Sequence, residues 1–158
     1  MPTCYFGAMV ETDIEAILAI ERQSFQRIWQ RTSFMAELAC DYAYPYTIRC
    51  EEGRNHPQIV AYNCFRVITD EMHLLRIAVA PRWRRRGVAS KLLEKCFVLA
   101  LEKGAVSAIL EVRPSNKSAI SLYQKLGFDL VEKRINYYTE TREDALILKK
   151  NLKETSWV

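Results

Sequence analysis

At Pro81 the hydrophobic pattern of the chain changes its period from two residues to about 3.6 residues. Before this point, "EMHLLRIAVA" (71–80) is rich in aliphatic residues and predicts a strand. After it, an apolar stripe with helical spacing predicts an amphipathic helix that ends at Gly104: Ala89, Leu92, Leu93, Cys96, Phe97, Ala100 and Leu101. The short basic run "PRWRRRG" (81–87) therefore connects a strand to a helix.

The rest of the sequence predicts a mixed α/β fold in the order β-α-α-β-β-β-α-β-α-β-β. Strands are expected in 4–10, 46–52, 58–68, 105–112, 128–139 and 144–152, and further helices from about residue 13, over 32–39 and over 115–127. The turn-like segments between the strands from 46 to 80 favour an antiparallel meander. The expected helix caps are Thr12 with Glu15, Thr32 or Ser33, and Ser115, with Asn116 as a second candidate beside Ser115.

Composition is that of one ordinary globular domain, residues 1–158, with 49% apolar and 27% charged residues. A net charge of +4 permits an anionic ligand without requiring a nucleic acid. The five cysteines include no C-x-x-C pair, so we expect buried free thiols in a reducing cytoplasm rather than a disulfide framework or a zinc site. His56 and His73 have no partner spacing for a metal. The first residues do not resemble a signal peptide, and no apolar run has the length of a membrane span, so a cytoplasmic protein without membrane contact is expected.

The position of the basic run suggests a phosphate site. The first turn of a helix leaves backbone N–H groups unpaired, and Gly87, Ala89 and Ser90 would let an anion approach them closely. The loop arginines would add forked hydrogen bonds to phosphate oxygens. The alternatives are a solvated basic loop or a nucleic-acid patch. A nucleic-acid patch predicts basic residues interleaved with aromatics over a broad face, and only Trp83 accompanies these arginines.

The segment "RWRRRGVASKLL" (82–93) resembles the Q/R-x-x-G-x-G/A signature of the GCN5-related N-acetyltransferase (GNAT) superfamily, with Arg84, Gly87 and Ala89 in the specified places. "LEVRPSNKSAISLYQKLGF" and "INYYTETREDALIL" are similar to its RimI-type branch, which acetylates protein N-termini. The resemblance covers about Glu71 to Leu148 and implies a single-domain, mostly antiparallel sheet flanked by helices. It also implies acetyl-CoA as co-substrate and no metal. The implied cofactor-binding residues are the strand residues Ile77, Ala78 and Val79, the loop and first helical turn Arg84, Arg85, Arg86, Gly87, Val88, Ala89 and Ser90, and also Asn116.

Acetyl transfer to an amine needs a base for the amine and an acid for the departing thiolate. Glu111 ends an apolar strand, where burial would make its carboxylate a better base; a strand-end glutamate paired with Arg113 or another cation is the alternative. Tyr123 lies on the inward stripe of its helix and is either a proton donor or a core tyrosine. The RimI-type resemblance assigns Glu111 as base and Tyr123 as acid.

The acceptor is expected to be the N-terminal amine of a protein, with a ribosomal protein as one candidate, attacked directly in a ternary complex. Trp29, Tyr137 and Tyr138 would line the peptide site; a surface hairpin is the alternative for the two tyrosines. RimI-type sequences tend to have an aromatic-Pro-Trp stretch here, and this chain has Arg27 and Ile28 before Trp29. Acetylation of lysine or a small amine, and a non-catalytic module that binds acetyl-CoA or nucleic acid, are the rival functions. The sequence makes no prediction about the oligomeric state.

Overall fold

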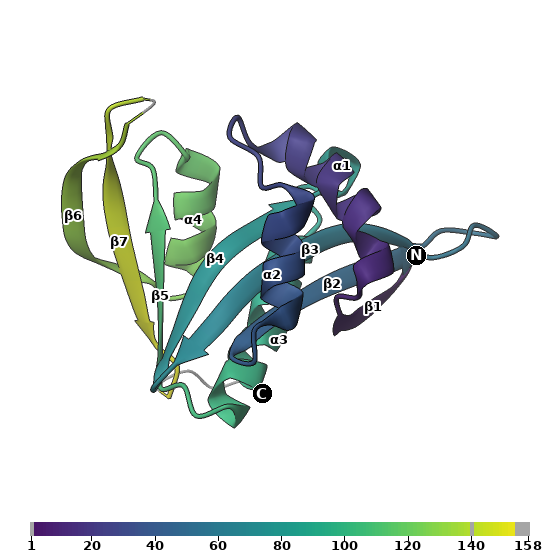
Figure 1. The fold of residues 1–158 in the computed structure, drawn as a ribbon, viewed down its shortest axis with the longest axis horizontal. Helices are drawn as coiled ribbons and strands as arrows, with labels where there is room; N and C mark the ends of the chain where they lie inside the picture. The colour runs from purple at the N-terminus through teal and green to yellow at the C-terminus, as the bar shows by residue number, and fades with distance from the viewer. Residues whose placement is uncertain (1, 140, 154–158) are drawn as a thin grey trace. The chain divides into compact units, whose positions relative to one another are not determined.

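The computed structural model describes residues 2–139 and 141–153, and its elements follow the predicted order. One sheet has the strand order β1-β2-β3-β4-β5-β7-β6. β4 pairs with β5 in parallel, whereas β1 with β2, β2 with β3, β5 with β7 and β6 with β7 pair antiparallel. The fold is therefore the mixed, mostly antiparallel α/β arrangement expected from the sequence (Figure 1). The elements are β1 (Thr3–Ala8), α1 (Ile14–Ser24), α2 (Arg31–Ala39), β2 (Ala43–Glu51), β3 (Gln58–Ile68), β4 (Glu71–Val79), α3 (Val88–Glu102), β5 (Ser107–Val112), α4 (Lys117–Lys125), β6 (Asp129–Tyr138) and β7 (Glu143–Asn151), with short 3-10 turns at Glu11–Asp13 and Pro81–Trp83.

The chain divides into two compact units, and β3, β4 and α3 each contribute to both. The first unit contains residues 1–66 and 76–96, and the second contains 67–75 and 97–158. The prediction of a single domain stays a prediction. Among the described residues, no helix is long and apolar enough to cross a membrane.

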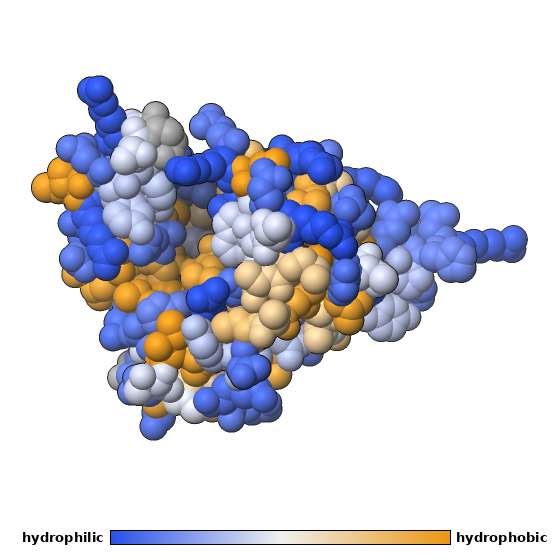
Figure 2. Space-filling view, in the orientation of Figure 1, coloured by the Kyte–Doolittle hydropathy of each residue, from blue (hydrophilic) through white to orange (hydrophobic). Residues whose placement is uncertain are grey.

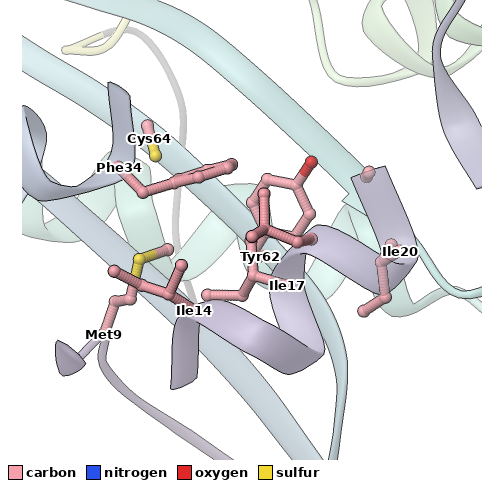
Figure 3. Packing of buried hydrophobic residues seen from close by; sticks show 9 residues of the cluster. Met9, Ile14, Ile17, Ile20, Phe34, Tyr62 and Cys64 are labelled. Carbon is pink, nitrogen blue, oxygen red and sulfur yellow. The ribbon is translucent and has the colours of Figure 1, made fainter. Parts of the chain in front are cut away.

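In the first unit, α1 and α2 cover one face of β2 and β3 (Figure 1). The apolar stripe of α1, including Ile14 and Ile17, packs with Phe34 of α2 and with Tyr62 and Cys64 of β3 (Figure 3). Since side chains alternate along a strand, the intervening residue Asn63 points to the opposite face. There it accepts a hydrogen bond from Cys96 of α3 at 3.3 Å. Helices thus cover both faces of this part of the sheet, and burial of their apolar stripes holds the unit together.

The second unit is built on β5 and β7. β4 pairs with β5 in parallel over Glu71–Leu74, and β7 pairs antiparallel with both β5 and β6. From α4, Tyr123 packs edge-on against Phe128, which also contacts Phe97 at 5.8 Å between ring centroids. This aromatic cluster fixes the buried side of α4, and with it the side chain of Tyr123.

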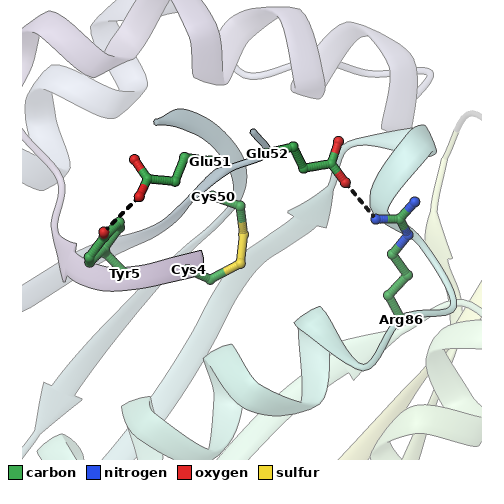
Figure 4. Close-up of a disulfide and its surroundings, with 6 residues drawn as sticks. All are labelled: Cys4, Tyr5, Cys50, Glu51, Glu52 and Arg86. Carbon is green, nitrogen blue, oxygen red and sulfur yellow. Dashed lines mark hydrogen bonds and ion pairs between the residues drawn. A yellow bond between two sulfur atoms is a disulfide. The ribbon is translucent and has the colours of Figure 1, made fainter. Parts of the chain in front are cut away.

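The expectation that the cysteines are all free and buried is wrong for Cys4 and Cys50, which form a disulfide (Figure 4). β1 and β2 are antiparallel neighbours, and their register places these two residues directly opposite each other, with Cα atoms 4.1 Å apart. Pairing across strands is invisible in the sequence spacing, because 46 residues separate the cysteines. Cys64 and Cys96 are buried free thiols as expected, whereas Cys40 is only half-buried.

The predicted helix caps are wrong for α1 and α2, and at α4 the second candidate, Asn116, is the cap. At the start of α1, Asp13 rather than Thr12 accepts a hydrogen bond, from the backbone N–H of Val10 at 2.9 Å. α2 begins after Gln30, which makes no side-chain cap. At α4, the side chain of Asn116 accepts from the backbone N–H of Ala119, while Ser115 instead bonds Glu143. At α4 two neighbouring polar residues could cap the helix, and because Ser115 bonds Glu143, Asn116 is the one that does.

Candidate active site

The predicted cofactor residues of the first unit form one continuous segment from the end of β4 to the first turn of α3. The backbone N–H of Ala80 donates to the carbonyl of Val60 at 2.8 Å, which fixes the end of β4 against β3. Arg84 then reaches back, and its Nε donates to the carbonyl of Val79 at 2.9 Å. Trp83, in the short turn between them, is buried. The loop is therefore anchored at its start by backbone bonds and a buried ring.

Gly87 is the residue at which the loop becomes a helix. Its φ of +76° lies in the left-handed region that glycine adopts readily, and a Cβ built there would meet nothing within 4 Å. Its carbonyl accepts from the backbone N–H of Lys91 at 3.1 Å, so α3 begins immediately after it. The N–H groups of Val88, Ala89 and Ser90 belong to the first helical turn, which leaves such groups without partners inside the helix. An open glycine beside a helix N-terminus fits a phosphate group.

The arginines of this loop precede that turn in the sequence and are exposed. Arg82 pairs at 2.5 Å with Glu52, which follows β2. Arg86 pairs with the same carboxylate at 3.5 Å (Figure 4). Arg86 also lies over the ring of Trp83, 4.7 Å from its centroid. Arg85 has a left-handed φ of +61°. Exposed ion pairs contribute little to stability, so the pairs with Glu52 can give way to a stronger anion.

Ile77, Ala78 and Val79 lie on β4 beyond the segment that pairs with β5, since the recorded pairing ends at Leu74 with Leu110. The side chain of Ala78 is buried in the core, and those of its two neighbours are half-buried. An extended chain could hydrogen-bond to such a strand segment in the manner of an added strand. This is the role that the resemblance implies for these residues.

Trp29 lies in the loop between α1 and α2. Its ring packs against Phe34, 5.3 Å between centroids, and is half-buried at the edge of the core cluster. Its backbone N–H donates to the carboxylate of Glu21 at 2.7 Å. The aromatic side chain is therefore held in place by both its ring and its backbone.

Glu111 belongs to the second unit, and its side chain is 39% exposed rather than buried. It forms an ion pair with Arg134 of β6 at 3.4 Å. An ion pair with a cation was the alternative interpretation of this strand-end glutamate, although the cation is Arg134 and not Arg113. Tyr137 also hydrogen-bonds to it, and this contact raises the pKa of the tyrosine. Arg113 lies over the ring of Tyr138, 4.2 Å from its centroid. Glu111 is thus a solvated carboxylate that contacts Arg134 and Tyr137. The expectation that it would be buried, and a better base for that reason, is wrong.

Tyr123 is buried, with 6% of its surface exposed, as its place on the inward stripe predicts. Burial raises the pKa of its phenol well above the usual value, and the nearby Tyr138 adds to the shift. Because the neutral form is favoured, the phenol keeps its proton throughout the neutral pH range. This is the state required of a general acid.

Tyr137 and Tyr138 pack edge-on against each other, 5.2 Å between ring centroids. They follow a break in the pairing of β6 with β7, where Asn136 has a φ of +52° and its N–H donates to Asp144. The second unit therefore brings together Glu111, Tyr137 and Tyr138, and Tyr138 couples electrostatically to Tyr123. Asn116 caps α4 in the same unit.

Three charged residues that contact the candidate site residues were not predicted from the sequence: Glu21, Arg76 and Arg134. Arg134, which pairs with Glu111, is one of several cations in a polar strand, and nothing in the sequence distinguishes it. Glu21 and Arg76 could have been found, because each is a charged residue on a buried apolar stripe. Among the residues that the structure describes, no group of three or more His, Cys, Asp or Glu side chains could hold a metal ion.

The family model described as the acetyltransferase (GNAT) family matches residues 14–128. The chain belongs to this family. The GNAT chain is 34% identical over 144 residues to the ribosomal protein bS18-alanine N-acetyltransferase of Escherichia coli strain K12, which covers 90% of this chain and 93% of that protein. It is 33% identical over 139 residues to the protein of the same name from Salmonella typhimurium, covering 87% and 90%. The crystal structure of the ribosomal-protein-S18-alanine N-acetyltransferase from Escherichia coli superposes with a TM-score of 0.83 at 29% identity, over 98% of this chain and 97% of that one.

Proposed function

We propose that this GNAT protein transfers an acetyl group from acetyl-CoA to the N-terminal α-amino group of a protein, and that its substrate is a ribosomal protein with an N-terminal alanine. The observation that carries the proposal is the similarity to relatives named as alanine N-acetyltransferases over 90% of the chain. The open glycine at the start of α3 and the protonated phenol of Tyr123 supply the matching chemistry.

The first unit would hold the co-substrate. The residues that fit it are Gly87 with the N–H groups of Val88, Ala89 and Ser90, which would bind phosphate oxygens, and the exposed arginines of the same loop, which would add charge. The backbone of Ile77, Ala78 and Val79 would bond the extended arm. Asn116, to which the resemblance also gives a cofactor contact, belongs to the second unit. When bound, acetyl-CoA supplies the activated acetyl group as a thioester.

The second unit would supply the proton transfers. An α-amino group with a pKa near 7.7–8.0 is already about one-tenth neutral at pH 7, so a solvated carboxylate such as Glu111 is a sufficient base, directly or through water. Tyr123 would donate its proton to the departing sulfur, and its raised pKa keeps the phenol protonated throughout the neutral pH range. Direct attack needs no covalent intermediate on the protein.

Three residues would contact the acceptor peptide: Trp29 of the first unit, and Tyr137 and Tyr138 of the second. These side chains are aromatic, and Arg134 lies 5.7 Å from the ring centroid of Tyr137. Such a site suits a short, packed N-terminal residue better than a polycationic amine, which would require a cluster of carboxylates. A lysine side chain, with a pKa near 10.4, has a much smaller neutral fraction at pH 7 and would require a stronger base.

The proposal is tested with a series of peptides that differ only in the first residue: alanine, serine, threonine and methionine. Acetylation is followed by the release of free thiol from acetyl-CoA. We expect the alanine peptide to have the highest kcat/KM. Equal rates for all four peptides would contradict the alanine preference, and no turnover with any of them would contradict the function.

A further inference from the structure

A fully buried carboxylate lies in the first unit, outside the groups already assigned to the reaction. Glu21 is on the apolar stripe of α1 and has no exposed surface. It accepts hydrogen bonds from the backbone N–H of Trp29, from the hydroxyl of Tyr62, and from Arg76. Burial raises the pKa of Tyr62, so its hydroxyl remains a donor. A carboxylate buried to this extent requires such partners, because an unpaired buried charge is strongly destabilising.

Arg76 is the cation of this cluster, and it contacts much more than Glu21. It lies on β4 directly before Ile77, and only 16% of its side chain is exposed. Its Nη2 also donates to the carbonyl of Arg27 at 2.9 Å. The guanidinium group lies 3.5 Å from the centroid of the Phe25 ring and 5.4 Å from that of Trp29. A planar, forked cation can make all of these contacts at once, which a lysine cannot.

These contacts converge on the α1–α2 loop, residues 25–30, which has no helix or strand of its own. Glu21 holds its backbone at Trp29, and Arg76 holds it at Arg27. Directly before this loop, the hydroxyl of Ser24 accepts a hydrogen bond at 3.2 Å from Arg84, which belongs to the arginine run at 82–86. The conformation of the loop is thus determined by side chains from α1, β4 and the arginine run rather than by its own backbone pairing.

We propose that Arg76 and Glu21 are positioning residues that hold the α1–α2 loop in the conformation that accepts a peptide, and thereby set the affinity for the acceptor without contacting the reacting atoms. The inference rests on the proposed function, in which Trp29 forms part of the acceptor site. Loss of the pair leaves the loop to be ordered by the peptide itself, which weakens binding. Peptide KM then rises, while acetyl-CoA affinity is kept.

The test removes the pair without leaving a buried charge. In Arg76→Met/Glu21→Gln, a neutral side chain of similar shape replaces each charged one, so a stranded ion does not dominate the result. Arg76→Lys keeps the positive charge but removes the planar guanidinium group, which donates several hydrogen bonds at once. The matched control is Arg66→Met/Glu37→Gln, since Arg66 of β3 and buried Glu37 of α2 form the same kind of pair, at 2.5 Å, in the same unit. No recorded bond of that control pair involves the α1–α2 loop.

Four quantities are measured for each protein: KM and kcat with the alanine peptide, the acetyl-CoA Kd by calorimetry, and the hydrogen-exchange rate of the Trp29 amide. For Arg76→Met/Glu21→Gln we expect KM to rise about tenfold with kcat and Kd changed less than about threefold, together with faster exchange at Trp29. Arg76→Lys should lie between this variant and the wild type. The control should lose stability yet keep the wild-type KM and Trp29 exchange.

Equal KM values in the two double variants, or unchanged exchange at Trp29, would overturn the proposal. If the Arg76→Met/Glu21→Gln protein does not fold, Arg76→Lys decides: wild-type KM and exchange in that variant count against the positioning role. If the wild-type protein acetylates no peptide, the proposed function fails separately. Exchange at Trp29 then decides whether the pair orders the loop.

Discussion

Replacement of Gly87 by valine separates the role of the glycine in folding from its role in binding. In the folded protein a Cβ at this position meets nothing within 4 Å, so the substitution causes no clash. The cost comes from the backbone, since φ is +76° and a residue with a side chain in the left-handed region loses about 1–2 kcal/mol. For a chain of this size we expect Tm to fall by about 2–8 °C.

Gly104→Val is the matched control, because Gly104 follows the other end of α3, has a φ of +95° and also has open space around its Cβ. Both variants should therefore show similar losses of Tm in thermal unfolding. Titration calorimetry should show acetyl-CoA affinity unchanged for Gly104→Val and weakened at least about tenfold, or 1.4 kcal/mol, for Gly87→Val. If folded Gly87→Val binds acetyl-CoA within about twofold of the control, the helix N-terminus does not hold the phosphates.

The other predictions concern chemistry and stability. Tyr123→Phe should lower kcat about 10²-fold and leave the acetyl-CoA Kd unchanged, which steady-state kinetics and calorimetry test together; full activity would remove the tyrosine from the mechanism. Because burial raises the pKa of Tyr123, its phenol stays protonated as pH rises. The wild-type kcat/KM should therefore increase with pH through the pKa of the peptide amine and then stay level to about pH 9.5. A decrease below that pH would count against Tyr123 as the general acid. Glu111→Gln should lose most activity near pH 6, where little of the amine is free, and a loss independent of pH would point to a structural role for its pair with Arg134. Cys4→Ser should lower the free energy of unfolding of the oxidised protein by about 2–4 kcal/mol in denaturant titrations and leave the reduced protein nearly unchanged; equal stability under oxidising conditions would contradict the disulfide.

Much of the fold could be predicted because local patterns and tertiary packing agree. The stripe from Ala89 to Leu101 follows one face of α3, and the strands from 58 to 79 have the expected bounds within a few residues. The change of period at the arginine run also predicted the start of a helix at Gly87, and α3 begins at the next residue, Val88.

The remaining features depend on contacts between distant segments. Cys4 meets Cys50 only through the register of β1 and β2, and Glu111 meets Arg134 only because β7 lies between their strands. The choice of Asn116 over Ser115 as a cap depends on Glu143, 28 residues away from the serine. No local pattern encodes these pairings, so a single sequence cannot distinguish them from their alternatives.

The most direct test of N-terminal acetylation compares two peptides that share one sequence with an N-terminal alanine and an internal lysine. One has a free terminus, and the other is blocked there. After incubation with the protein and acetyl-CoA, tandem mass spectrometry locates the added acetyl group. We expect it on the α-amine of the free peptide alone, with the blocked peptide left unmodified. Acetylation of the lysine in the blocked peptide at a comparable rate would show that the acceptor is a side-chain amine.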